Sequence, residues 1–156
     1  MAILTNFPLV AAFASILLAQ LVKVPLHYIA ARKWAWGLAF STGGMPSSHS
    51  AAVASLAAAI GIEQGVASAY FAISVVFAAI VMFDACGIRR QAGEQAVIIN
   101  RLTEEFHYLF HDKGKAHGTG VDRKALKELL GHRPIEVFVG CLFGAAISLI
   151  MYFLWY

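Results

Sequence analysis

Three short segments of this 156-residue sequence carry side chains suited to binding an anion and transferring a proton. The first, residues 43–50, reads Gly-Gly-Met-Pro-Ser-Ser-His-Ser and leads directly into an apolar stretch. Pro46 together with Ser47 or Ser48 predicts a capped helix start. Backbone N–H groups at such a start attract anions, and His49 adds a group that can transfer a proton. For this segment alone, an ordinary capped helix start is the alternative interpretation.

The second segment, residues 84–93, contains the pair Arg89 and Arg90. Guanidinium groups bind phosphate through forked, charge-assisted hydrogen bonds, although arginines also anchor helix ends at a membrane surface. The third segment, residues 131–136, contains His132 and Glu136, four positions apart. One helical turn would bring this carboxylate to the imidazole, fix its tautomer and favour the imidazolium, as a nucleophilic or basic histidine requires.

Other polar side chains have weaker claims to a chemical role. Lys23 lies near the inner end of the first apolar stretch, where it could snorkel to the surface or point into the bundle toward an anion. The spacing of His107 and His111 would suit a metal, with Asp112 and His117 nearby. Because no Cys or Glu completes that set, we expect no metal and no cofactor, and we interpret these histidines as interfacial polar residues.

The composition places this chemistry in a membrane. The chain is 60% hydrophobic and 13% charged, with a mean hydropathy of +0.70, whereas soluble domains are about half apolar. The net charge is only +3, and no basic run or basic-aromatic pattern is present, which excludes nucleic acid as the main partner. The partner that this composition indicates is the membrane itself.

The pattern of apolar stretches predicts an all-α fold: a single membrane domain, residues 1–156, with about four transmembrane helices. Each crossing needs about 20 apolar residues. The predicted spans are residues 7–31, 48–65, 67–83 and 134–156. Between them, residues 84–133 form a polar insertion with an amphipathic helix around residues 94–110 and a short helix over residues 122–130. These helices either lie flat on the bilayer or pack on the bundle.

The basic residues fix the predicted orientation. All twelve fall on one side of the four-span arrangement, and the opposite side carries only Glu63. They are Lys23, Arg32, Lys33, Arg89, Arg90, Arg101, Lys113, Lys115, Arg123, Lys124, Lys127 and Arg133. The positive-inside rule makes this side cytoplasmic and puts both termini outside. The three segments described above and Lys23 share that side.

Small residues recur at four-residue spacing on two of the predicted helices. They are Gly140, Gly144 and Ser148 in the last span and Ala51, Ser55 and Ala59 in the second. Such stripes allow close helix packing. Packing within one chain is the default interpretation, and a homodimer contact is the alternative.

Taken together and in order, the three segments resemble the divergent type 2 phosphatidic acid phosphatase family, which is related to the vanadium haloperoxidases. The resemblance covers nearly the whole chain. It implies metal-independent phosphate ester hydrolysis through a phosphohistidine. His132 matches the nucleophile, with Glu136 where the parent superfamily has Asp. His49 follows a Pro-Ser-Ser rather than a Pro-Ser-Gly element.

The same resemblance implies phosphate contacts from Arg89 or Arg90, from Lys23 and from the helix start at Ser47 and Ser48. The separation between Arg90 and His132 is longer than the superfamily pattern, so the intervening residues must loop out if His132 is to be the nucleophile. The implied substrate is a lipid phosphate such as phosphatidate or phosphatidylglycerol phosphate. The alternatives are a non-enzymatic scaffold or anionic-lipid-binding protein and, less favoured, a transporter.

Overall fold

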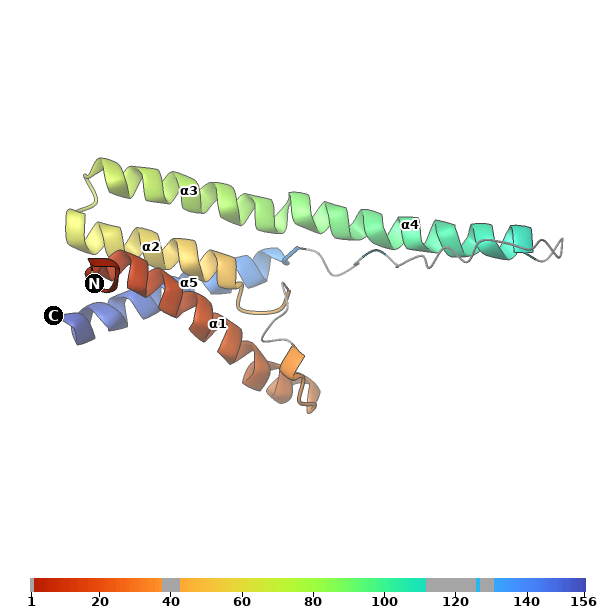
Figure 1. The fold of residues 1–156 in the computed structure, drawn as a ribbon, viewed down its shortest axis with the longest axis horizontal. Helices are drawn as coiled ribbons and strands as arrows, with labels where there is room; N and C mark the ends of the chain where they lie inside the picture. The colour runs from red at the N-terminus through yellow and green to blue at the C-terminus, as the bar shows by residue number, and fades with distance from the viewer. Residues whose placement is uncertain (1, 38–42, 112–125, 127–130) are drawn as a thin grey trace.

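The structure, a computed structural model, describes residues 2–37, 43–111, 126 and 131–156, and all regular elements in these ranges are helical (Figure 1). In chain order they are the short 3-10 helix η1 (Ala2–Thr5), α1 (Phe7–Ala31), α2 (Ser48–Gln64), α3 (Ala69–Cys86), α4 (Ile88–His111) and α5 (Pro134–Trp155). The predicted all-α fold is therefore confirmed. The short helix predicted over residues 122–130 lies outside the described residues, apart from Leu126.

Three helical segments of the described chain are long and apolar enough to cross a membrane: Phe7–Ile29, Ala69–Phe106 and Pro134–Trp155. The sequence predicted about four crossings, with residues 48–65 as the additional one. The helix found there, α2, has 17 residues and is therefore about 26 Å long, less than the ~30 Å of a typical hydrocarbon core. Length and composition thus support a membrane protein with three such segments and a shorter central helix.

Polar caps explain where the bundle helices begin. The side chain of Asn6 accepts a hydrogen bond from the N–H of Leu9 (3.0 Å), and Ser68 accepts one from Phe71 (3.2 Å). Ser47 caps α2 by accepting from the N–H of Ser50 (3.3 Å). Each cap satisfies an N–H group that has no partner inside its own helix.

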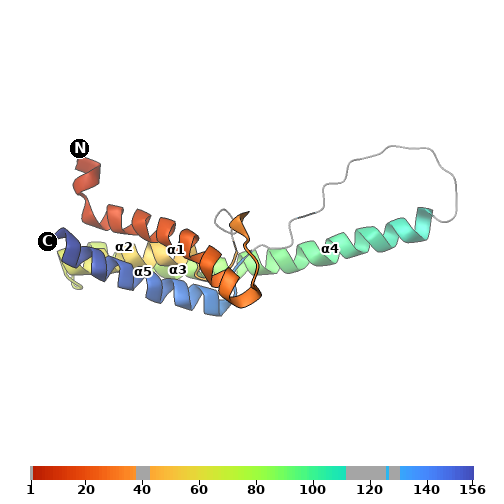
Figure 2. The same ribbon diagram turned by 90° about the horizontal axis from the view of Figure 1, so that it is seen from below.

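Helix α2 forms the centre of the bundle, with α1 and α3 on opposite sides of it and α5 against a third face (Figures 1 and 2). The contact between α2 and α5 is close, because a Cβ atom added at Gly144 would overlap the carbonyl group of Ala51. Gly140 lies equally close to the backbone of Ser47. The small-residue stripe therefore packs α5 onto α2 within one chain, and a homodimer contact stays a prediction.

Helix α4 continues the direction of α3 after an interruption at Gly87 and extends beyond the bundle (Figure 1). It contacts the end of α3 and none of the other described helices. The sequence predicted a helix lying on the bilayer or packed on the bundle. The observed helix is longer than predicted and does not pack along the bundle, because only a single residue, Gly87, separates it from α3.

The two chain termini lie at one end of the bundle, together with the turn between α2 and α3 (Figures 1 and 2). The start of α2, the end of α3 and the start of α5 meet at the other end. Phe7 closes the terminal end, where its ring packs against Tyr152 at a centroid distance of 5.9 Å. The three chemically interesting segments all lie at the opposite end.

Candidate active site

The residues on either side of the long insertion lie next to each other at one end of the bundle, which brings the second and third segments together. The N–H of His132 donates a hydrogen bond to the carbonyl oxygen of Ala85 (2.9 Å). Next to it, Gly131 adopts a φ of +89° and lies so close to the backbone of Arg90 that a Cβ atom would overlap it. A glycine is required there for both reasons. The condition for His132 to share a site with the arginines is therefore met.

A second set of contacts brings the first segment to the same place. The N–H of Ser47 donates to the carbonyl oxygen of Glu136 (3.1 Å), so the start of α2 is fixed against the first turn of α5. As a result, the rings of His49 and His132 lie 6.2 Å apart between centroids, at an interplanar angle of 75°. The two imidazoles that the sequence singled out are neighbours.

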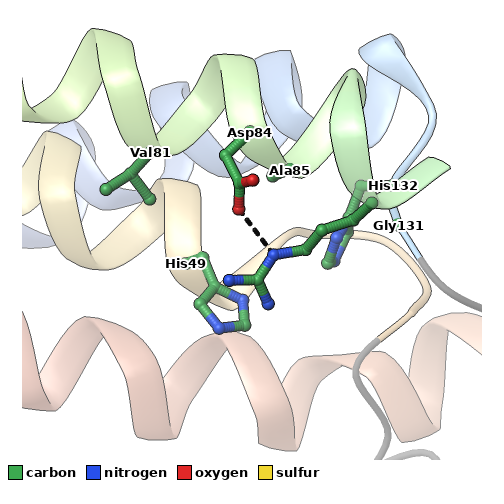
Figure 3. Close-up of a pocket in the computed structure, with 7 residues that line it drawn as sticks. His49, Val81, Asp84, Ala85, Gly131 and His132 are labelled. Atoms are coloured by element: carbon green, nitrogen blue, oxygen red, sulfur yellow. Dashed lines mark hydrogen bonds and ion pairs between the residues drawn. The ribbon is translucent and has the colours of Figure 1, made fainter. Parts of the chain in front are cut away.

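Both rings line a cavity of about 60 Å³ (Figure 3). The other residues that line it are Val81, Asp84, Ala85, Arg89 and Gly131. Since one water needs about 10–15 Å³ of such space, the cavity has room for several waters or for a compact tetrahedral anion. Figure 3 shows His49 and His132 on either side of the cavity, with Asp84 above them.

The structure distinguishes the two arginines. Arg89 lines the cavity, and its Nε donates to Oδ2 of Asp84 (2.6 Å). Arg90 instead pairs with Glu94 one turn along α4 (3.0 Å) and is absent from the cavity lining. Of the pair, Arg89 is the one placed to bind a phosphate. The carboxylate of Asp84 holds this guanidinium at the cavity.

Lys23 is buried, with only 2% of its surface exposed. Of the two sequence-based alternatives, snorkelling and an inward orientation, the structure shows the inward one. The side chain passes beneath Gly44, where a Cβ atom added to the glycine would lie 3.9 Å from Cδ of the lysine. Its charge acts on His49, His132 and Glu136. Lys23 therefore contributes positive charge to the site from α1.

Glu136 does not bond to His132 as the four-residue spacing predicted. Its carboxylate accepts a hydrogen bond from the N–H of Arg133 (3.2 Å), forming a capping box at the start of α5. The helix begins only at Pro134, so His132 precedes it and the one-turn geometry does not apply. The Nε2 atom of His132 is buried without a hydrogen-bond partner in the described residues.

The two serines are buried and are not among the residues that line the cavity between the histidines. Besides accepting from the N–H of Ser50, the hydroxyl of Ser47 accepts from the hydroxyl of Ser50 (3.0 Å). Ser48 lines a neighbouring cavity. The geometry gives Ser47 a capping role, and the phosphate contacts expected of the two serines stay a prediction.

Electrostatics at the site favour a neutral His132. Burial, followed by the positive charges of Lys23, His49 and Arg89, lowers the pKa of His132 from 6.5 to about 4. The sequence predicted that a carboxylate would favour the imidazolium. The opposite holds, because cations surround the ring and Glu136 bonds elsewhere. A neutral imidazole keeps the lone pair that a nucleophile needs.

No cluster of three or more potential metal ligands occurs among the described side chains. His107 and His111 belong to the last turns of α4, where side chains are not described, and Asp112 and His117 lie outside the described residues. Cys86 and Cys141 are free cysteines.

The fold and the site together define a class: a helical membrane protein with a cationic cavity between two histidines at one end of its bundle. The sequence matches the Divergent PAP2 family over residues 4–147, and the chain belongs to that family. The chain is also similar to a protein named "Uncharacterized membrane protein YuiD" from Bacillus subtilis (strain 168), with 50% identity over 154 residues, 97% of each chain. No solved structure matches it.

Proposed function

We propose that this protein is a phosphatase that hydrolyses the phosphate monoester of a membrane lipid through a phosphohistidine on His132. The observation that carries the proposal is the pair of imidazoles, 6.2 Å apart between centroids, on either side of a cavity that Arg89 also lines. The family resemblance in all three segments supports the same chemistry.

In the first step, Nε2 of neutral His132 attacks phosphorus as the bond to the leaving oxygen breaks. His49, in its protonated form, gives its proton to that oxygen and releases the lipid alcohol. A phosphorus atom between the rings would have the attacking nitrogen and the leaving oxygen on opposite sides, as in-line transfer requires.

In the second step, neutral His49 takes a proton from water, and the resulting hydroxide attacks the phosphohistidine. The N–P bond breaks, inorganic phosphate is released, and neutral His132 is regenerated. Arg89 and Lys23 offset the negative charge on the non-bridging oxygens in both steps, and their fixed positions reduce the cost of reorganisation. Asp84 holds Arg89 in place.

We further propose that the site faces the cytoplasm and that both termini face outward. The basic residues that the structure describes lie toward the end of the bundle that holds the site or on α4 beyond it (Figure 1), and positive residues favour the cytoplasmic side of a membrane. A site at this end of the bundle suits the headgroup phosphate of a lipid whose hydrocarbon chains stay in the bilayer. Phosphatidate and phosphatidylglycerol phosphate are the substrates we favour on that face.

The test is release of inorganic phosphate from a panel of lipid phosphates by the detergent-solubilised protein, with and without a chelator. We expect turnover that the chelator does not abolish, that His132→Ala abolishes and that His49→Ala lowers about a hundredfold or more. His27→Ala is the matched control, because its ring bonds to the carbonyl of Lys33 (3.1 Å) away from the cavity. Turnover retained in both cavity variants would reject the proposal and favour a non-enzymatic lipid-binding role.

A further inference from the structure

A second cavity opens directly beside the first. It has a volume of about 340 Å³ and shares His49 and Val81 with the cavity between the histidines. Its other lining residues are Ile16, Gln20, Ser48, Ala52, Val53 and Phe77. We call this second cavity the α1–α3 groove. Its volume falls within the ~300–1,000 Å³ range of small-molecule sites, which are mostly apolar.

The arrangement of the helices explains why the groove exists. Helices α1 and α3 flank α2 on opposite sides and do not pack against each other in the described structure (Figure 1). None of the described helices therefore covers the face of α2 between them. Ala52 forms part of its floor, and the small side chain leaves the space open. Because α1 and α3 both belong to segments long and apolar enough to cross a membrane, a groove between them would open sideways toward the hydrocarbon of the bilayer.

The same face of α2 continues away from the site. A third cavity, of about 520 Å³, begins at Leu56 and Ile60 and ends at the polar residues Glu63 and Gln64. Along α2, the distance from His49 to Ile60 is about 16 Å at 1.5 Å per residue. Cavities therefore border this face of α2 both beside the imidazoles and near its far end.

We infer that the α1–α3 groove binds the hydrocarbon chain of the substrate, which enters sideways from the bilayer between α1 and α3. This inference rests on the proposed function, since the chain must belong to a molecule whose phosphate lies between His49 and His132. Two observations support this occupant. The groove shares His49 and Val81 with the phosphate cavity, and its lining residues other than Gln20, Ser48 and His49 are apolar.

The test blocks the groove without touching the phosphate cavity. Ala52→Phe fills the floor, and Ala79→Phe makes the same change on the exposed side of α3. The substrates are dioleoyl phosphatidate, with long chains, and dibutyryl phosphatidate, with short ones. We expect Ala52→Phe to lower kcat/KM for the long-chain substrate at least tenfold, with less than threefold change for the short-chain one. Ala79→Phe should change neither. Equal values for Ala52→Phe and wild type on both substrates, or an equal loss on both, would overturn the inference.

A second readout does not need turnover. The inactive variant His132→Ala is incubated with a phosphatidate that carries a photoreactive diazirine in its acyl chain, then irradiated and digested. We expect label on the peptides that contain Ile16 and Phe77, reduced when Ala52→Phe is added. Label spread over the outer surface of the helices would overturn the inference that the groove binds the hydrocarbon chain. If the wild-type protein hydrolyses neither substrate, the proposed function fails, and the labelling alone decides whether the groove binds a chain.

Discussion

The backbone N–H of His132 donates a hydrogen bond to the carbonyl oxygen of Ala85, over 2.9 Å. This bond joins the segment just before α5 to the last turn of α3, although residues 86–131 separate the two in sequence. It places an imidazole beside a guanidinium and opposite a second imidazole, and the proposed chemistry depends on that arrangement.

We predict that His49→Ala lowers kcat about 10²- to 10⁴-fold for phosphatidate, the usual range for loss of a general acid or base. The loss in the phosphorylation step should be much smaller for a substrate with a p-nitrophenol leaving group, because that leaving group needs no proton. Burst kinetics on both substrates measure this step. An equal loss of burst rate with both leaving groups would mean that His49 does not protonate the leaving oxygen.

Replacing each of the two arginines by alanine should affect activity to very different extents. Arg89→Ala removes a cation from the cavity and should lower kcat/KM about 10²- to 10³-fold, as for other groups that stabilise transition-state charge. Arg90→Ala should stay within about threefold of wild type, since an exposed pair with Glu94 contributes little. Steady-state kinetics with phosphatidate as substrate measure kcat/KM for both variants. The reverse order of effects would show that Arg90 binds the phosphate.

The titration of His132 should occur far below that of an ordinary histidine. Burial and neighbouring cations lower its pKa to about 4, so the ring stays neutral as the pH falls from 7 to 5. NMR of ¹³C-labelled histidine in detergent, with His132→Gln to assign the signal, measures the midpoint. Arg89→Ala should raise it, because one of the repelling charges is gone. A midpoint at or above 6.5 would contradict the cationic environment we describe.

The same shift makes a prediction about stability. Between pH 6.5 and about 4, the unfolded chain binds a proton at this histidine that the folded chain does not bind. The contribution of His132 to the free energy of unfolding is therefore fully present above pH 6.5 and is lost as the pH falls toward 4. Wild type should lose more stability than His132→Gln over that interval.

The close contact between α2 and α5 should tolerate no added methyl group. Gly144→Ala places a Cβ atom on the carbonyl of Ala51, and we expect it to destabilise the bundle by about 1–3 kcal/mol, the usual cost of overpacking. Gly37→Ala is the control, because a Cβ atom there meets nothing within 4 Å. Thermal unfolding in detergent measures both. Equal unfolding midpoints for the two variants would show that α2 and α5 can move apart without a loss of stability.

Much of the site could be predicted because its residues have unusual types for their places in the chain. Histidines, arginines and a lysine at the ends of apolar stretches cost free energy in a membrane protein and therefore indicate a functional site. The order of the apolar stretches predicted that these ends lie on one side of the membrane. His49, Arg89 and His132 were all found in this way, although the sequence could not separate Arg89 from Arg90. That choice depends on how the backbone of Gly131 packs against the start of α4.

The remaining differences between the predicted and the observed site come from contacts that residue spacing in the sequence does not determine. The predicted pairing of His132 with Glu136 assumed a helix across both residues, but Pro134 starts the helix between them. The inward position of Lys23 depends on which face of α1 meets α2. For Asp84, pairing with one of the arginines and capping or solvation of a helix end explain the sequence equally well, and the structure shows the pairing, with Arg89 at the cavity.

The most direct test of the central claim is to trap the phosphorylated protein. His49→Ala, which should slow dephosphorylation, is mixed with ³²P-labelled p-nitrophenyl phosphate and quenched in base, where phosphohistidine survives. Digestion and mass spectrometry should locate the label on His132, and the double variant that also carries His132→Ala should show none. Label on another residue, or full turnover in the absence of His132, would contradict the account.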